Sequence, residues 1–508
     1  MKVNIENQLR TYIESANVSE IDWSGRELHE IPAEINQVKG LERLNLECNS
    51  LAFLPKEIEE LRHLLWLDLS NNKFTDLPDK LTTLSGLKWL DLSANDFKSL
   101  PPSFGSLSNL DWLDLKNNRL EDLPDTFGEL HNLRKLNLEV NELKELPPPV
   151  CALNELTWLD LSDNKFESLP PEFSGLQRLE WLDLEENPLR ELPEAVCDLI
   201  NLKELDLTAI QISTLPDAIG KLSCLEWLDL SCNQLEVLPF TIGKLNKLEC
   251  LDLSKNKLTQ LPDSMADFKA LNRLNLEHNN FGGWVPVVSQ LTHLRELDLT
   301  DTGLTAIDNS IAGLTALEWL DLSENRIKKL SADIGSLPNL YWLDCRQNYI
   351  EIIEDSFFDL AELRELYLGN NKLSFLNQNI GQLESLELLD LSYNELSVLP
   401  EEISKLYMLG RLDLTDNRLS SLPDSFGELS HLIELKLSDN LISSLPAGFE
   451  KLQNLRLLDL SNNNLSEFPE SLSLLSNTLS ELYLSDNPIN EESQQHIKAM
   501  FPDTRIDF

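Results

Sequence analysis

The chain has 508 residues, 42% of them apolar, and its 86 Asp and Glu against 42 Lys and Arg give a formal net charge of -44. Such an excess of negative charge repels nucleic acids and anionic membranes, so it disfavours both as partners and favours a basic protein surface. No segment approaches the ~20 consecutive apolar residues of a membrane span, so no membrane insertion is expected.

The first segment, residues 1–17, is predicted to be an N-terminal helical cap. It has no apolar run flanked by small residues, so it does not resemble a secretory signal. Its apolar residues fall at helical spacing: Val3, Ile5, Leu9, Tyr12 and Ile13.

From Val18 to Leu455 one phrase recurs every 23 residues, and after one added residue a last copy begins at Leu479, which gives about 21 repeats. Each reads L-x-x-L-x-L-x-x-N-x-L-x-x-L-P-x-x-I-x-x-L-x-x, numbered below as positions 1 to 23. The alternating L-x-L predicts a short strand, and L-P-x-x-I-x-x-L predicts a 3₁₀ or helical turn that Pro opens. One repeat cannot bury its apolar side chains alone, so we expect a stack with parallel strands ~4.8 Å apart, forming one domain over residues 18–487.

Position nine is Asn in almost every repeat, and an Asn ladder can satisfy the backbone groups left unpaired at the bend after each strand. Ile210 and Thr302 interrupt this ladder. The Leu-Pro pair is also lost in consecutive repeats of the block 271–385. Two interpretations are open: drift in repeats that still stack, or a functional change, which would be a change of curvature or a second contact surface.

After Asn487, EESQQHIKAMFP reads as a helix and TRIDF as a final strand. Residues 488–508 are therefore expected to form a C-terminal cap, because an open end of a solenoid exposes apolar surface and strand edges. On this interpretation no room is left for a catalytic domain.

The repeat resembles that of leucine-rich repeat proteins, and its 23-residue L-P-x-x-I-x-x-L form is similar to the Ras-pathway scaffold and Ras-suppressor-like group. The resemblance implies an α/β fold: a curved solenoid with parallel strands on its concave face and short 3₁₀ or helical turns on its convex face. It says little about function, because the repeated residues are those that the fold itself requires.

The side chains at positions three and five are expected to point outward from the concave sheet, because the leucines at positions four and six point inward. Eight of the ten tryptophans occupy position three, and fifteen repeats have Asp at position five. These give the candidate partner-binding residues Trp66, Trp89, Trp112, Trp158, Trp181, Trp227, Trp319 and Trp342, with Asp68, Asp91, Asp114, Asp160, Asp183, Asp229, Asp321 and Asp344.

An open face would keep the repulsion between neighbouring acids below ~1 kcal/mol, so we expect a hydrated acidic stripe beside the tryptophans. A cationic partner would relieve that repulsion and could use the Trp faces, at roughly 0.5–2 kcal/mol for each cation–π contact. The alternative is that both residue types are consensus features of the repeat and that the rings only stack on one another.

The sequence gives no sign of catalysis, and no cofactor or metal site is predicted. The seven cysteines are odd in number and lack CxxC spacing, which disfavours disulfides and zinc and favours a reducing cytoplasm. There is no phosphate-binding loop, no Ser/His signature, and no reason to expect a buried carboxylate with a shifted pKa.

We therefore interpret the chain as a non-enzymatic scaffold for a basic partner protein in intracellular, cytoplasmic signalling. Two alternatives remain: a bacterial effector that binds a protein in the host cytosol, and recognition of a carbohydrate or other small ligand on the aromatic stripe. No feature of the sequence indicates an oligomeric state.

Overall fold

The computed structural model describes residues 2–15 and 18–508, with side chains from Ile5 onward, so Met1, Ala16, Asn17 and the side chain of Val3 lie outside the described residues. The chain forms two compact units. The N-terminal unit comprises Met1–Lys257 and Asp267–Ala270, and the C-terminal unit comprises Leu258–Ala266 and Leu271–Phe508. Each repeat of a solenoid contacts only its neighbours, so few contacts cross any one section of the stack.

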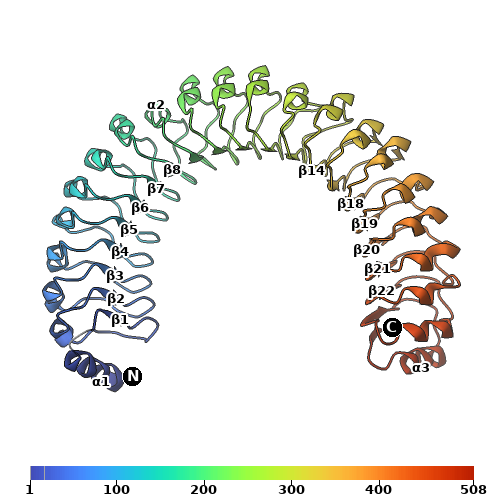
Figure 1. The fold of residues 1–508 in the computed structure, drawn as a ribbon, viewed down its shortest axis with the longest axis horizontal. Helices are drawn as coiled ribbons and strands as arrows, with labels where there is room; N and C mark the ends of the chain where they lie inside the picture. The colour runs from blue at the N-terminus through green and yellow to red at the C-terminus, as the bar shows by residue number, and fades with distance from the viewer. Residues whose placement is uncertain (1, 16–17) are drawn as a thin grey trace. The chain divides into compact units, whose positions relative to one another are not determined.

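The N-terminal unit contains one parallel sheet of three-residue strands, each in register with the strand one repeat away. In Figure 1 these strands line the inner edge of the unit. The strands are β1 (Glu20–Asp22), β2 (Arg43–Asn45), β3 (Trp66–Asp68), β4 (Trp89–Asp91), β5 (Trp112–Asp114), β6 (Lys135–Asn137), β7 (Trp158–Asp160), β8 (Trp181–Asp183), β9 (Glu204–Asp206), β10 (Trp227–Asp229) and β11 (Cys250–Asp252).

The C-terminal unit is built in the same way, with neighbouring strands again parallel and in register. Its last strand confirms that TRIDF closes the stack as a strand. The strands are β12 (Arg273–Asn275), β13 (Glu296–Asp298), β14 (Trp319–Asp321), β16 (Trp342–Asp344), β18 (Glu365–Tyr367), β19 (Leu388–Asp390), β20 (Arg411–Asp413), β21 (Glu434–Lys436), β22 (Leu457–Asp459), β23 (Glu481–Tyr483) and β24 (Arg505–Asp507).

Short helices line the outer edge of each unit, as the repeat pattern predicts (Figure 1). In the N-terminal unit they are η1 (Ala33–Gln37), η2 (Lys56–Glu60), η3 (Asp79–Thr83), η4 (Phe104–Ser106), η5 (Asp125–Glu129), η6 (Pro148–Ala152), η7 (Pro171–Gly175), α2 (Glu194–Cys197), η8 (Asp217–Lys221) and η9 (Phe240–Lys244). Those that follow are η10 (Asp263–Asp267), η11 (Pro286–Gln290), η12 (Asn309–Gly313), η13 (Ala332–Ser336), η14 (Asp355–Asp359), η15 (Gln378–Gln382), η16 (Glu401–Lys405), η17 (Asp424–Glu428), η18 (Phe449–Lys451) and η19 (Glu470–Leu475).

Each unit also has one longer helix next to a chain end. Helix α1 (Lys2–Glu14) buries Ile5 and Leu9. Helix α3 (Glu491–Met500) buries Ile497. Both helices therefore turn an apolar side toward the neighbouring repeat, as expected of caps.

The Asn ladder forms as predicted and is buried. In a typical repeat, Asn95 Nδ2 donates to the carbonyl oxygens of Leu69, Leu92 and Ser93, and its Oδ1 accepts from the Phe74 N–H at 3.0 Å. Each amide thus joins its own bend to the repeat before it.

The two gaps in the ladder are repaired differently. At Ile210 the Leu189 N–H turns instead to the carbonyl of Asn187, at 2.9 Å. Thr302 keeps part of the pattern, because its hydroxyl donates to the Leu299 carbonyl and its N–H donates to Asn325 Oδ1.

In the block 271–385, polar side chains replace the missing prolines. Asp308, Ser331 and Asn377 each accept a hydrogen bond from the N–H two residues ahead, at the start of η12, η13 and η15. Where Glu354 stands in place of Pro, the backbone has an N–H donor, which donates to the Leu330 carbonyl at 3.2 Å. This bond lies beside a small sheet formed by β15 (Lys329–Leu330) and β17 (Ile352–Ile353). The altered repeats still stack.

Candidate partner-binding surface

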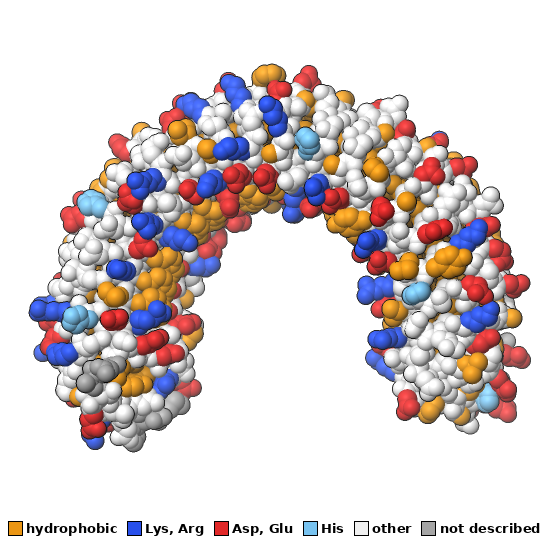
Figure 2. All heavy atoms as spheres, viewed as in Figure 1, with side chains coloured by type: hydrophobic (Ala, Val, Ile, Leu, Met, Phe, Trp, Pro, Cys, Tyr) orange, Lys and Arg blue, Asp and Glu red, His pale blue; other side chains and the backbone are white. Residues whose placement is uncertain are grey.

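All sixteen predicted residues lie on one face of the sheet in their own unit, which we call the Trp–Asp face. Each strand has its central Leu buried and its first and third residues on the other side. Figure 2 shows hydrophobic side chains gathered along the inner edge of the N-terminal unit, where these strands lie.

The tryptophans form stacked rows rather than separate rings. The centroids of Trp66 and Trp89 are 4.4 Å apart, and those of Trp89 and Trp112 are 4.3 Å apart with planes 1° from parallel. Two further stacks join Trp158 to Trp181 and, in the C-terminal unit, Trp319 to Trp342. Trp227 has Glu204 and Cys250 as its strand neighbours and stacks on no ring among the described residues.

Stacking changes what these rings can offer a partner. In the row Trp66–Trp89–Trp112 the inner faces cover one another, and the outer face of Trp66 lies under the guanidinium of Arg43, at 4.8 Å. The rings of this row thus stack on one another, as the alternative in the sequence analysis has it, and the faces between them are not open to a cation. Its ring edges remain, together with indole N–H groups that have no hydrogen-bond partner in the described part of the chain.

Each Asp at position five has a structural role that the sequence analysis did not include. Its Oδ1 accepts the backbone N–H two residues ahead, for example from Ser93 to Asp91 at 2.9 Å and from Glu185 to Asp183 at 2.8 Å. Asn45 and Asn137 accept the same bond in their repeats. The occurrence of Asn in place of Asp was the available signal, because the two share this acceptor but not the charge.

These acids are less hydrated than the sequence analysis expected. Asp68, Asp160 and Asp344 are buried, at 7%, 6% and 1% exposure, and most of the other Trp–Asp face acids are half-buried. Burial, aided by the neighbouring carboxylates, raises the pKa of Asp91 to about 7. Burial likewise raises the pKa of Asp183 to about 8.

The expectation of no buried carboxylate with a shifted pKa is therefore wrong. Strands one repeat apart place identical acids side by side, and burial together with repulsion between them disfavours the charged form. Asp183, Glu185 and Asp206 come close enough for their carboxylate oxygens to lie within 4.8 Å of one another. This proximity follows from the strand register and does not by itself make a metal site.

The C-terminal unit shows what a cation does on this surface. Arg346 Nε donates to Asp344 Oδ2 at 2.7 Å, and its guanidinium lies 4.7 Å from the ring centroid of Tyr367. The chain itself thus combines a carboxylate, a guanidinium and an aromatic ring, an arrangement that the sequence analysis did not anticipate.

The fold and this surface define the class of protein. Each unit is a solenoid of short parallel strands, with one side-chain face of the sheet free for recognition. Models of the leucine-rich repeat region match residues 56–146 and 194–299, and models of the leucine rich repeat match residues 141–189, 292–350, 316–373, 338–396, 362–419 and 408–465. Together these matches cover well over half of the chain, which belongs to the leucine-rich repeat family. Proteins of this family generally act as binding scaffolds, and no catalytic family is indicated.

Several solved structures are similar to this chain along almost their whole length. A leucine-rich repeat protein of Leptospira interrogans is 28% identical, with 98% of each chain covered and a TM-score of 0.52. The Arabidopsis receptor kinase HAESA, solved with the peptide hormone IDA and the co-receptor SERK1, is 27% identical over 96% of this chain and 90% of its own, with a TM-score of 0.59. The plant peptide hormone receptor RGFR1, solved with RGF2, is 25% identical over 91% of this chain and 88% of its own, with a TM-score of 0.53.

No curated protein matches the sequence. Among the described residues, no helix combines the length and the apolar character needed to cross a membrane.

Proposed function

We propose that this protein is a non-enzymatic scaffold that binds the basic side chains of a partner protein on the Trp–Asp face of its N-terminal unit. The central patch consists of Trp66, Trp89 and Trp112 with Asp68, Asp91 and Asp114, on the adjacent strands β3, β4 and β5. Family membership and the peptide-bound relatives HAESA and RGFR1 support a protein or peptide ligand.

The observation that carries the proposal is a row of carboxylates without an ion-pair partner. No Lys or Arg of the described residues forms an ion pair with Asp68, Asp91 or Asp114. The charge of Lys116 lowers the pKa of Asp114, but Lys116 forms its ion pair with Glu139. A guanidinium or ammonium group from a partner would supply the missing charge, as Arg346 does for Asp344.

The edges of the patch suggest its extent. Arg43 precedes the row and Lys135 follows it, and the residue at position five beside each of them is Asn rather than Asp. Arg43 and Lys135 thus bound a run of three consecutive acids, and a second run of acids begins beyond Lys135 at Asp160 on β7. A run of three strands fits a few basic side chains of one segment.

The cellular setting is also a proposal. Seven free cysteines support a reducing compartment, and the 23-residue form of the repeat suggests intracellular signalling assembly. The same surface could serve a bacterial effector in a host cytosol, and a translocation assay of the N-terminal segment would separate these settings. Stacked Trp faces give a sugar ring little to stack on, which speaks against carbohydrate recognition by the Trp66–Trp112 row.

The test replaces the three acids of the patch by Asn: Asp68→Asn, Asp91→Asn and Asp114→Asn together. This change keeps the Oδ1 acceptor that Asn45 and Asn137 already provide, so the strands should be undisturbed. Trp→Ala variants are less informative, because each ring is also part of a stack that contributes about 0.5–1.5 kcal/mol per pair to stability. The probe is a fluorescent peptide with arginine at alternate positions, titrated by anisotropy against a glutamine version.

We expect the triple variant to bind the arginine peptide at least about tenfold more weakly, since charge pairs across interfaces are worth more than ~1.5 kcal/mol. Binding to the wild type should strengthen from pH 5.5 to pH 8, because Asp114 and Asp91 ionise through their pKa values of about 6 and about 7. The matched control removes three charges from the other unit: Asp390→Asn, Asp413→Asn and Asp459→Asn. Equal loss in both triple variants would mean that net charge, and not the patch, attracts the peptide.

A further inference from the structure

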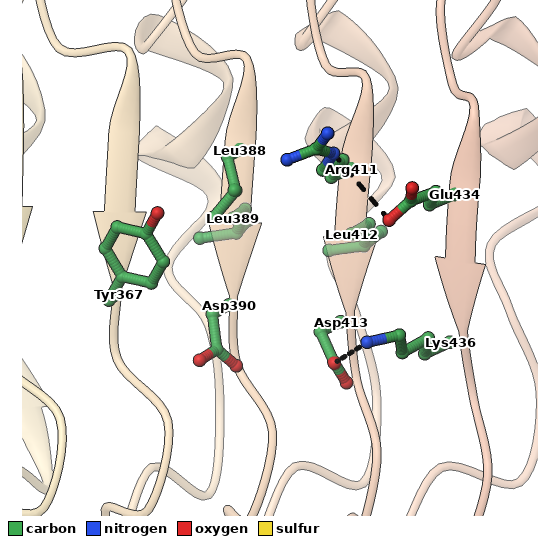
Figure 3. A pocket seen from close by; sticks show the side chains of 9 residues that line it. All are labelled: Tyr367, Leu388, Leu389, Asp390, Arg411, Leu412, Asp413, Glu434 and Lys436. Carbon is green, nitrogen blue, oxygen red and sulfur yellow. Dashed lines mark ion pairs between the residues drawn. The ribbon is translucent and has the colours of Figure 1, made fainter. Parts of the chain in front are cut away.

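The C-terminal unit has a hollow of about 230 Å³ on its sheet face, over β19 and β20. Figure 3 shows Tyr367 on one side of it, Leu388 and Asp390 on β19, and Arg411 and Asp413 on β20. This volume lies below the ~300–1,000 Å³ typical of pockets for whole small molecules, so it suits a single side chain.

The hollow exists because the aromatic row stops. Trp319 and Trp342 occupy position three, with 4.4 Å between their ring centroids, and the ring of Tyr367, at position five of the next repeat, lies 5.6 Å from that of Trp342. Glu365 and then Leu388 follow Trp342 at position three, and neither carries a ring. Space for a ring is left beside Tyr367.

Tyr367 and Arg411 form the two sides of this space. Arg346 and Trp342 contact Tyr367 from the preceding repeat, and the Tyr367 hydroxyl donates to Glu365 at 2.6 Å, so the side of Tyr367 toward β19 is the one that lines the hollow. Arg411 is 63% exposed, and its Nε lies 3.7 Å from Glu434 Oε2, beyond hydrogen-bond distance. Its guanidinium is therefore available to pack on another group.

The floor of the space carries acceptors. Asp390 Oδ1 accepts from Ser392, whereas its Oδ2 has no hydrogen-bond partner among the residues that the structure describes. Asp413 Oδ1 accepts from Thr415, and its Oδ2 lies 3.4 Å from the Lys436 ammonium. A group placed between Tyr367 and Arg411 would thus meet carboxylate oxygens at its lower edge.

We propose that this hollow receives one aromatic side chain with a hydrogen-bond donor, tyrosine or tryptophan, from a partner protein. The negative face of its ring meets the Arg411 guanidinium, and its other face packs against Tyr367. Its O–H or N–H donates to Asp390 or Asp413. The chain already makes the same kind of contact twice, where Arg346 lies on Tyr367 and Arg43 lies on Trp66.

This site lies in the C-terminal unit and uses no residue of the Trp66–Trp112 row, so either proposal can fail alone. The test titrates the full chain with N-acetyl-L-tyrosinamide and N-acetyl-L-tryptophanamide, followed by saturation-transfer NMR. N-acetyl-L-phenylalaninamide, which lacks the ring donor, is the reference probe. Fragments of this size should bind with a Kd on the order of 1 mM.

Leu388→Trp would fill the hollow with a ring of the chain itself, as Trp does at position three of many repeats. We expect it to weaken binding of both donor probes at least about tenfold, because their place between Tyr367 and Arg411 is then taken. Leu457→Trp makes the same change at the same repeat position outside the lining and should leave binding unchanged. Arg411→Gln, which leaves the space open, should weaken binding severalfold and decides the question if Leu388→Trp is unstable.

The proposal is overturned if neither donor probe binds the wild type up to its solubility limit. It is also overturned if Arg411→Gln binds both probes as tightly as the wild type does. The same holds for Leu388→Trp, provided that its melting temperature shows it to be folded. Equal affinity for the phenylalanine probe would remove the hydrogen-bonding part and overturn the choice of tyrosine or tryptophan.

Discussion

Asp183→Asn should make the protein more stable at alkaline pH, even though it removes a residue that the repeat prefers. Asp183 lies on β8 between Asp160 and Asp206, and burial followed by repulsion from these neighbours raises its pKa from 3.8 to about 8. When the pKa of a group is higher in the folded state than in the unfolded state, the folded protein binds more protons than the unfolded chain at pH values between the two pKa values. The stability that neutral Asp183 contributes is thus fully present below about pH 4 and is lost as pH rises through about 8.

The size of the effect can be bounded. A pKa raised from 3.8 to about 8 corresponds to at most about 6 kcal/mol, at about 1.4 kcal/mol per pKa unit. Water still reaches this half-buried carboxylate, so we expect a gain of only about 1–2 kcal/mol for Asn at pH 8.5. That gain corresponds to roughly 2–8 °C in melting temperature for a unit of this size.

The assay is thermal unfolding of the wild type and Asp183→Asn between pH 5 and pH 8.5. The two proteins should be similar at pH 5, where Asp183 is neutral, and should diverge as pH rises. Asp183→Ala, which also loses the acceptor for the Glu185 N–H, should be less stable than Asp183→Asn at every pH. Asp459→Asn is the matched control, because the strand beside Asp459 presents Lys436. Parallel melting curves for the wild type and Asp183→Asn across the pH range would refute the reasoning.

Three further predictions concern stability. Asn95→Ala should cost about 3–5 kcal/mol in denaturant unfolding, because it leaves several buried backbone groups unpaired, whereas the exposed Asn109→Ala should cost less than ~1 kcal/mol. Val140 has φ 54° at position eight, so Val140→Asn should stabilise by about 1 kcal/mol and Asn117→Val should destabilise by a similar amount; no difference in either variant would exclude strain there. Glu354→Pro removes the N–H bound to Leu330 and also the carboxylate that accepts from the Ala332 N–H and pairs with Lys329; compared with Glu354→Ala, which loses only the carboxylate, its stability should differ by less than ~1 kcal/mol, and a larger loss would show that the β15–β17 pairing matters.

The period of the sequence was enough to predict the strands, the buried leucines and the Asn ladder, because each follows from one repeat stacked on the next. It also correctly placed Trp66 and Asp68 on the Trp–Asp face, on the side of the sheet opposite the buried leucines. It left open how equal residues on neighbouring strands meet. With Trp at position three of three consecutive repeats, the strand spacing favours face-to-face rings, which the sequence analysis named only as an alternative to open Trp faces.

Other features could not be derived from single positions. The left-handed backbone at position eight is marked by Gly only at Gly25, and otherwise only the frequent Asn and Asp there, as at Asn71 and Asp163, indicate it. The raised pKa values depend on how deeply each carboxylate is buried in the folded stack, which a repeat consensus does not report. The contact of Arg346 with Tyr367 joins two residues that each depart from the consensus, so no pattern predicts it.

The stacked rows affect the entropy that the protein loses when it binds a ligand. A tryptophan fixed between two others, such as Trp89, has already lost its rotamer freedom when the chain folds. Ordering a free side chain on association costs about 0.5–1.5 kcal/mol, and Trp89 escapes that cost. The row is therefore a preorganised surface, on which a ligand meets the same shape at every encounter.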